Sequence, residues 1–267
     1  MQIKFAALAA LASISALPLT ARAEDPPASP LSFNVGVVTD YRYRGISQSR
    51  LKPALQGGAD YAFASGLYVG TWASTISWIK DAGKINGVDA GSTPLEIDLY
   101  GGYKGDIVKD TLSYDVGGLY YLYAGNKLNK IPGASKADTF EVYGALTAGI
   151  FTGKYSYSLT NLFGNGGSGG AAKSTGSFYV DLSANADLGN GVTLTPHVGW
   201  QKIKNYDTYS YIDYSVTVAK DFGKGFSGSV AVIGADAKKV NGVSVYTSPS
   251  GKNLAAGALV LGAKYTF

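Results

Sequence analysis

The chain of 267 residues contains no cysteine, and its only methionine is the initiator. The absence of cysteine excludes a disulfide framework and a thiolate metal site. Beyond the first 25 positions, no segment has the roughly 18 consecutive apolar residues that a membrane-spanning helix needs. Charged residues are also scarce, at 16% of the chain. The apolar residues must therefore be spread through the sequence rather than gathered in long runs.

Glycine and tyrosine are abundant instead, with 36 and 20 residues, while mean hydropathy is near zero. This composition suits strands that hide their apolar residues in alternation with polar ones. Without Lys4 and Arg22, which lie in the N-terminal segment described next, 21 basic residues face 19 acidic ones. That near balance lacks the charge pattern of a nucleic-acid-binding protein.

The N-terminus has the three parts of a secretory signal. Lys4 supplies the positive charge, Phe5–Ala16 is apolar, and Ala21-Arg22-Ala23 is an A-x-A cleavage site. We therefore predict a signal peptide over residues 1–23. The Pro-rich segment Glu24–Pro30 that follows is predicted to be an extended periplasmic linker.

The last stretch, Leu254–Phe267, alternates apolar with small or polar residues and ends on two outward aromatics, Tyr265 and Phe267. A strand with one apolar and one polar face suits the wall of a membrane barrel, where the apolar face contacts lipid and the polar face lines the lumen. By itself the stretch also fits an edge strand of a soluble sandwich. The aromatic end resembles the terminal signal of outer-membrane barrels, which implies the barrel assembly machinery as a partner through Tyr265 and Phe267.

From Leu31 onward the same unit repeats: an alternating run, then a turn or loop rich in Gly, Asn, Asp, Lys or Ser. We count twelve runs, at Leu31–Arg44, Ala54–Ala64, Leu67–Trp78, Leu95–Lys104, Thr111–Ala124, Asp138–Phe151, Lys154–Phe163, Ser177–Leu188, Val192–Gln201, Tyr211–Phe222, Phe226–Ala237 and Leu254–Phe267. The third run leaves its register open, because Tyr68 and Trp72 share one face while Leu67 and Val69 occupy the other. Aromatics near strand ends, including Phe33, Tyr41 and Tyr43, are expected to form girdles facing lipid.

The connections decide the architecture. Five are short, at Ser65–Gly66, Gly105–Asp110, Thr152–Gly153, Gly189–Gly191 and Gly223–Gly225. Six longer ones alternate with them, at Gly45–Pro53, Ile79–Pro94, Gly125–Ala137, Gly164–Gly176, Lys202–Ser210 and Lys238–Asn253. An outer-membrane barrel has short periplasmic turns and long external loops, whereas a sandwich has no reason for this alternation. The sequence therefore predicts an all-β, transmembrane antiparallel up-and-down β-barrel of about 12 strands over residues 31–267.

Charged residues on the polar faces are expected to line the lumen, because a charge facing lipid at mid-membrane costs about 2–4 kcal/mol. Our candidates for pore lining and constriction are Arg42, Arg44, Asp40, Asp60, Glu96, Asp98, Asp115, Glu141, Asp181 and Asp213, and Lys104, Asp187, His197 and Lys264 lie on the same faces. Either they form a network that rigidifies or plugs the barrel, or they line a path for a hydrophilic solute. Lumenal tyrosines could stack on a solute ring or merely fill space: Tyr100, Tyr121, Tyr123, Tyr143 and Tyr179.

The predicted external loops are basic, with 13 lysines and arginines against Asp81, Asp89, Asp138 and Asp207. Such loops would concentrate anions at the mouth or contact anionic lipopolysaccharide and outer-membrane lipid, and we favour the second interpretation. His197 is the only histidine. Outer-membrane lipid hydrolases pair His with Ser on a barrel wall, but TLTPHVGWQ offers no Ser two residues away. We predict a protein without enzymatic activity, cofactor or metal.

The N-terminal third resembles a proteobacterial family, the TorF-type porins, also catalogued as Gcw-type conserved proteins. The residues that carry the resemblance are SFNVGVVTDYRYRGISQS (Ser32–Ser49), KPALQGGADYAF (Lys52–Phe63) and SGLYVGTWAST (Ser65–Thr75). Gly70-Thr71-Trp72 holds the place of the family's G-x-W element, with Thr71 where the family name implies Cys. The resemblance implies an outer-membrane barrel and a pore, and it carries no settled substrate.

We therefore predict a porin of the Gram-negative outer membrane that lets small hydrophilic solutes diffuse passively. Within Tyr41–Gln48, the densest family motif, Arg42 and Arg44 are our first choice for a constriction or gate near the outer mouth, and a structural clamp on the first loop is the alternative. Two other functions stay open: a plugged barrel that acts through its external loops as an adhesin or structural protein, and a lipid hydrolase that uses His197.

Overall fold

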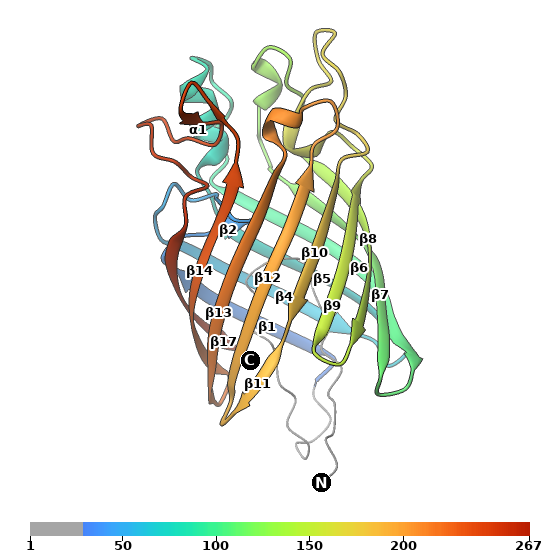
Figure 1. Cartoon of the computed structure of the whole chain (residues 1–267). Helices are drawn as coiled ribbons and strands as arrows, with labels where there is room; N and C mark the ends of the chain where they lie inside the picture. Colours follow the sequence, from blue (N-terminus) through green and yellow to red (C-terminus); the bar gives the residue numbers. More distant parts are fainter. Residues whose placement is uncertain (1–28) are drawn as a thin grey trace.

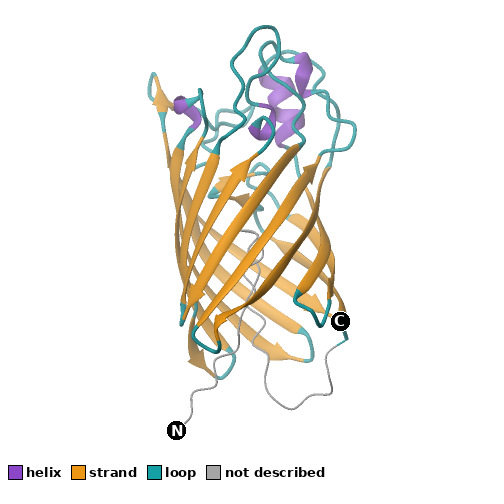
Figure 2. Ribbon diagram, turned by 90° about the vertical axis from the view of Figure 1, so that its right-hand side faces the viewer, coloured by secondary structure: helices purple, strands orange, loops and turns teal. Residues whose placement is uncertain are grey.

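The alternating runs form the wall of a closed antiparallel barrel in the computed structural model, which describes residues 29–267 (Figures 1 and 2). The main sheet has 13 strands, and two of them, β10 and β11, are halves of one wall strand interrupted at Asn185, because both pair with β12. The wall therefore has twelve strands, as predicted. The predicted signal peptide (residues 1–23) and residues 24–28 of the linker lie outside the described residues.

The wall strands are β1 (Leu31–Val38), β4 (Ala54–Ala62), β5 (Leu67–Thr75), β6 (Leu95–Val108), β7 (Leu112–Leu122), β8 (Thr139–Ala148), β9 (Phe151–Ser158), β10 (Phe178–Ala184) with β11 (Ala186–Gly189), β12 (Val192–Lys202), β13 (Tyr211–Gly223), β14 (Phe226–Ala237) and β17 (Ala258–Thr266). Each pairs antiparallel with the next wall strand along the chain, and β1 closes the barrel against β17. Phe33 and Phe267 exchange two backbone hydrogen bonds of 2.9 Å at this seam, and their rings stack at 5.7 Å.

Long and short connections alternate around the barrel, as predicted. The long ones contain the helices α1 (Trp78–Ile85), η1 (Leu128–Lys130), η2 (Leu162–Gly164) and η3 (Asp207–Tyr209) and the small hairpins β2 (Arg42–Tyr43)–β3 (Ile46–Ser47) and β15 (Lys239–Val240)–β16 (Val243–Ser244). We call their end of the barrel the loop end and the opposite end the turn end (Figure 2). Within residues 29–267, no helix is long and apolar enough to cross a membrane.

The two faces of the wall differ as the period-two pattern requires. Outward positions carry exposed apolar side chains, such as Val35, Leu99 and Leu261, and inward positions carry most of the polar and charged ones. Strand β5 resolves the open register, because Leu67 and Val69 are exposed while Tyr68 and Trp72 are buried inside the barrel. The outer surface is therefore an apolar band around a polar interior.

Inside the barrel, tyrosine rings lie against glycines of the neighbouring strand, which explains why both residues are abundant. Tyr68 pairs directly with Gly102 and Tyr100 with Gly70 across β5 and β6, while Tyr143 pairs with Gly117 across β7 and β8. A Cβ added at Gly70 would lie 2.6 Å from Asp60 Oδ1 and would also meet the Tyr100 ring. Glycine thus makes room for a flat ring on a crowded inner surface.

Several predicted boundaries were wrong, and one error changes the interpretation of the lumen. The first strand ends at Val38 rather than Arg44, and Tyr41 and Tyr43, predicted to face lipid, are 2% and 7% exposed inside the barrel. Thr39 ends the wall segment by donating its amide to the Leu261 carbonyl at 2.9 Å. The alternating pattern continues past this point, but the chain turns inward.

The other boundary errors are smaller. The short turn predicted at Thr152–Gly153 lies at residues 149–150, and β9 ends at Ser158, so Phe163 lies in a loop and packs on Tyr43 and Tyr121. The third run ends at Thr75, and Trp78 begins α1.

Candidate functional site in the lumen

The connection between β1 and β4 folds into the barrel, and we call residues 40–51 the inserted hairpin. Its strands β2 and β3 are joined by Arg44 and Gly45, whose φ angles of 46° and 78° are those of a type I′ turn. A Cβ at Gly45 would lie 2.5 Å from the Gly234 carbonyl oxygen and 2.7 Å from Asp213 Cβ. Glycine therefore allows the tip of the hairpin to touch strands β13 and β14 of the wall.

Arg44 holds the tip through a buried, two-pronged ion pair with Glu141 of β8. Its Nη1 lies 3.1 Å from Oε1 and its Nη2 lies 2.7 Å from Oε2. Nη1 also donates to Gln201 Oε1 at 2.5 Å, and the guanidinium lies 4.1 Å from the ring centre of Tyr179. Paired hydrogen bonds between a guanidinium and a carboxylate are strong and geometrically specific.

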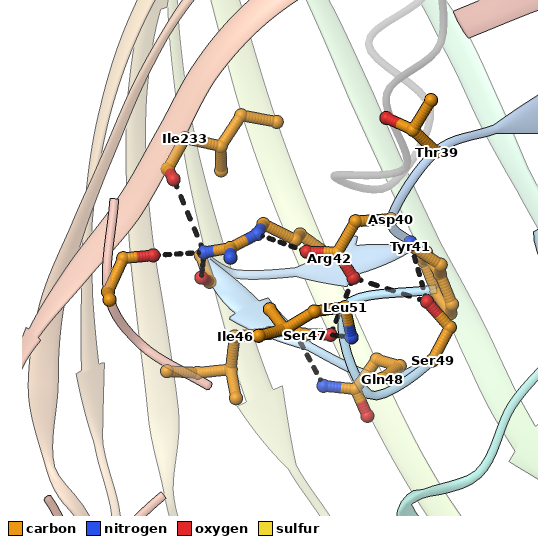
Figure 3. A network of polar contacts seen from close by, with 12 residues as sticks. Thr39, Asp40, Tyr41, Arg42, Ile46, Ser47, Gln48, Ser49, Leu51 and Ile233 are labelled. Atoms are coloured by element: carbon orange, nitrogen blue, oxygen red, sulfur yellow. Dashed lines mark hydrogen bonds and ion pairs between the residues drawn. The ribbon is translucent and has the colours of Figure 1, made fainter. Parts of the chain in front are cut away.

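Arg42 anchors the other side of the hairpin (Figure 3). Its Nε donates to Asp40 Oδ2 at 2.7 Å, and its Nη1 donates to the backbone carbonyls of Ile233 at 3.3 Å and Ala256 at 2.7 Å. Asp40 Oδ1 accepts hydrogen bonds from Ser47 at 2.5 Å and from Ser49 at 3.2 Å. Arg42 therefore joins the hairpin to β14 and to the segment before β17.

Tyr41 and Tyr43 fill the space between the hairpin and strands β5 to β8. The Tyr41 hydroxyl donates to Glu96 Oε1, while Tyr123 donates to Oε2 of the same carboxylate at 2.6 Å. The hydroxyls of Tyr43 and Tyr121 lie 2.7 Å apart. These rings belong to an apolar cluster that also contains Trp72, Ile76, Ile79, Leu119, Leu128 and Ala137. On the opposite side Ile46 packs against Tyr211, Ala237, Leu254 and Ala255.

The hairpin nearly fills the barrel at this level. A cavity of about 10 Å³, enough for one water molecule, lies among the hairpin tip and strands β7 to β10. Its lining residues are Arg44, Leu119, Tyr121, Tyr143, Lys154, Ser156, Tyr179 and Asp181. The conformation is therefore closed at its loop end.

Toward the turn end the wall carries charges of both signs. Lys104 pairs across the strands with Asp115, and Lys154 pairs with Asp181. Asp115 accepts a hydrogen bond of 2.6 Å from Tyr68, and the Lys154 ammonium lies 3.9 Å from the ring centre of Tyr143. Lys154 is thus a lumenal cation that the sequence analysis missed, although it occupies an inward position of β9.

His197 lies between two carboxylates on the wall below the hairpin tip. Its Nδ1 is 3.1 Å from Asp181 Oδ2, and its Nε2 is 2.9 Å from Asp213 Oδ1 and 3.2 Å from the Tyr179 hydroxyl. Because the ring of Tyr179 supports Arg44, this network connects His197 to the hairpin. In residues 29–267 the ring nitrogens of His197 contact carboxylates and a phenol, and neither Ser183 nor Ser215, its cross-strand neighbours, hydrogen-bonds to the ring as the serine of a hydrolase would.

The structure divides the predicted lumenal residues into groups. Asp40, Arg42 and Arg44 lie on the inserted hairpin, so their placement on a wall strand was wrong. Glu96, Glu141 and Asp213 lie on the wall near the hairpin. Asp98 is 1% exposed, and its Oδ1 has no hydrogen-bond partner in the described part of the chain. Asp60, Asp115 and Asp181 lie on the wall away from the direct hairpin contacts. Asp187 lies in β11 near the turn end, where it is exposed and accepts the Gly189 amide at 2.8 Å.

The interior geometry, a closed barrel with a hairpin folded inside, agrees with a family match over nearly the whole chain. A family model described as "Bacterial protein of unknown function (Gcw_chp)" matches residues 22–267. The chain belongs to the Gcw_chp family. The match confirms the family predicted from the N-terminal third. No curated protein matches this Gcw_chp chain.

Solved porins share the fold of the Gcw_chp barrel. The NanC porin aligns with a TM-score of 0.52 at 11% identity, over 88% of this chain and 98% of that one. The KdgM porin aligns with a TM-score of 0.50 at 9% identity, over 88% of this chain and 99% of that one. The KdgM porin in complex with disordered oligogalacturonate aligns with a TM-score of 0.51 at 9% identity, over 89% of this chain and 98% of that one. At such identities the likeness concerns the fold alone, a closed antiparallel β-barrel.

Proposed function

We propose that this Gcw_chp protein is an outer-membrane channel for the passive diffusion of small hydrophilic solutes, and that the inserted hairpin opens and closes it. The observation that carries the proposal is that the wall is complete without the hairpin. Val38 pairs directly with Ala54, so β1 and β4 remain neighbours whatever the position of residues 40–51. The hairpin can therefore leave the lumen without breaking the barrel.

The polar contacts that hold the hairpin can be exchanged for water, and they are the ion pairs to Glu141 and Asp81 and the hydrogen bonds to carbonyls and carboxylates. The aromatic packing of Tyr41 and Tyr43 opposes release, because release exposes apolar surface to water and so favours the closed state. Removal of the hairpin would expose a wall rich in charged groups, which water solvates readily. Closed and open states of one barrel then differ in the position of a single loop.

The charges of the wall indicate which solutes would pass. Once the hairpin leaves, its Arg42 and Arg44 leave with it. The wall then carries more carboxylates than cations, namely Asp60, Glu96, Asp98, Asp115, Glu141, Asp181 and Asp213 against Lys104, Lys154, Lys264 and His197. Such a surface concentrates cations and repels anions. We therefore propose neutral or cationic hydrophilic solutes, rather than a polyanion such as the oligogalacturonate of the KdgM complex.

Planar-bilayer recording of the refolded chain in a potassium chloride gradient tests this proposal. We expect infrequent stepwise openings with a reversal potential on the cation-selective side. Anion-selective openings would contradict the solute class. A folded, inserted barrel that never opens would contradict the channel.

A second function is favoured by the filling of the lumen. The hairpin, α1 and the loop containing η1 pack into one cluster, and Arg50 Nε donates to Asp81 Oδ2 of α1 at 2.6 Å. A barrel that stays plugged in this way would act through its external loops as an adhesin or structural protein. The recording above distinguishes the two, because a plugged barrel stays silent.

A further inference from the structure

A cleft of about 560 Å³ lies outside the lumen, at the loop-end rim of β10 and β12. Gly176, Phe178, Lys202, Lys204, Asn205 and Asp207 line it. Phe178 is the first residue of β10, Lys202 is the last of β12, and the two are paired across the strands. They share the outward face with the pairs Val180–Trp200 and Leu182–Val198. The cleft therefore opens where the apolar band ends.

Two hydrogen-bond donors meet in this cleft without a carboxylate or carbonyl to receive them. In the described part of the chain, Lys204 has no carboxylate within ion-pair distance, and the Tyr157 hydroxyl has no hydrogen-bond partner. A Cβ at Gly176 would lie 3.0 Å from the Tyr157 hydroxyl and 3.4 Å from Lys204 Nζ. Both groups therefore lie against Gly176 of the cleft wall, where a side chain would crowd them.

Hydrogen bonds of the backbone and a neighbouring ion pair hold the loop that surrounds the cleft. The Lys204 amide donates to Ser177 Oγ at 3.1 Å, and Asn205 Nδ2 donates to the Lys173 carbonyl at 2.9 Å. Lys202 Nζ donates to Asp207 Oδ1 at 2.5 Å, and this contact holds the pKa of the exposed Asp207 below its usual range. The cleft therefore combines one paired and one unpaired ammonium group.

An aromatic border separates the cleft from the aliphatic surface. The rings of Tyr155 and Phe178 stack at 5.6 Å, and Phe178 meets Trp200 edge to face at 5.2 Å. Beyond Trp200 toward the turn end, Val198 and Leu182 are 45% and 55% exposed. Aromatic rings at such a border mark the level of lipid head groups in membrane barrels.

We propose that this cleft binds the phosphorylated sugar head group of an outer-leaflet glycolipid, the lipopolysaccharide anchor. A phosphate accepts hydrogen bonds from Lys204 and Tyr157 and draws Lys202 from Asp207, while acyl chains lie along Leu182 and Val198. The inference rests on the outer-membrane placement in the proposed function and is independent of conduction. The basic external loops were expected to contact lipopolysaccharide, and the cleft is the place where we propose that this contact occurs.

Lipid binding to the refolded full chain in detergent tests the inference, with native mass spectrometry and Trp200 fluorescence as readouts. The probes are bisphosphorylated lipid A, the same lipid without phosphate, and inorganic phosphate. Lys202→Gln/Lys204→Gln should weaken lipid A binding at least about tenfold, because the variant loses both charged hydrogen-bond donors to the phosphate. The matched control Lys80→Gln/Lys84→Gln removes the same charge from exposed positions of α1, in the connection between β5 and β6, and should bind like the wild type.

Three results would overturn the inference: equal loss of binding in both double variants, unchanged binding of the dephosphorylated lipid, or inorganic phosphate that competes fully with lipid A. The first would indicate general charge attraction, the second an apolar surface, and the third a site for free phosphate. Heat-dependent gel mobility checks that the barrels of both double variants fold. Binding is measured in the closed barrel, so a silent channel does not affect the outcome.

Discussion

Arg44 of the inserted hairpin and Glu141 of the wall face each other in a fork-to-fork ion pair, and both side chains are 2% exposed. The two hydrogen bonds measure 3.1 Å and 2.7 Å. Removal of one partner from a buried ion pair typically costs about 3–5 kcal/mol, because the other charge is left unpaired. Here the loss of one partner destabilises the closed state, in which the hairpin lies in the lumen. The open state is less affected, because there Arg44 and Glu141 can both be solvated by water.

Arg44→Ala should therefore increase channel opening in planar bilayers. The variant loses the ion pair, the bond to Gln201 and the stacking on Tyr179, so we expect at least a tenfold higher open probability, which corresponds to about 1.4 kcal/mol. Lys52→Ala, an exposed change in the same connection, is the matched control and should behave like the wild type. An Arg44→Ala barrel that folds and opens no more often than the control would show that this pair does not hold the gate.

Gly102→Ala should destabilise the barrel without affecting its topology. The added methyl group would lie 2.5 Å from the Val116 carbonyl oxygen and would displace the Tyr68 hydroxyl. Overpacking of this kind typically costs about 1–3 kcal/mol, which urea unfolding in detergent or lipid measures. Gly144→Ala is the control, because its Cβ would meet nothing closer than Val116 Cγ1 at 3.9 Å. Equal stability of the two variants would contradict the tyrosine-on-glycine packing.

His197→Gln should make open channels more cation-selective at pH 5. At this pH an ordinary histidine, with a pKa near 6.5, carries its proton. The substitution then removes a positive charge from between Asp181 and Asp213. The reversal potential in a salt gradient should shift toward that of potassium, and His197→Arg should restore the wild-type value. An unchanged potential in His197→Gln would place the ion path away from this side of the lumen.

The sequence was sufficient to predict the wall. Strict alternation at Leu95–Lys104 or Ser177–Leu188 assigns each residue to lipid or lumen, because a one-residue slip would move every side chain to the wrong face. The alternating lengths of the connections gave the topology and the loop end. The alternation left the register of the run Leu67–Trp78 open, because tyrosine and tryptophan suit either face, since each has an apolar body and a polar tip.

The inserted hairpin could not be predicted from periodicity. Tyr41, Arg42, Tyr43 and Arg44 continue the alternation of β1, and nothing local distinguishes a strand that reaches the membrane surface from one that turns inward. What fixes the turn is distant in sequence: Glu96, Glu141, Gln201 and Ala256 supply the partners of the hairpin. The type I′ turn at Arg44-Gly45 was the one local signal available, because glycine there favours a tight hairpin.

The alternation indicated which charged residues turn away from lipid, but it contained no information on their pairing. Arg42 and Arg44 were expected to project from the wall, whereas both come from the inserted hairpin, where Arg44 pairs with Glu141 of the wall and Arg42 pairs with Asp40 of the hairpin itself. Lys154 was overlooked because Tyr155 and Tyr157 dominate its strand. Contacts of this kind depend on the order of strands around the barrel and on the stagger between them, which the alternation of a single strand does not contain.

The most direct test of the account replaces residues 40–52 with Asn-Gly, so that Thr39 and Pro53 are joined by a short turn. Val38 and Ala54 are already paired, so the barrel should fold and insert. In planar bilayers the account predicts that the infrequent openings of the wild type become a large, continuous and cation-selective conductance. A shortened barrel that folds and inserts, yet conducts no better than the wild type, would contradict the hairpin as the gate of this channel.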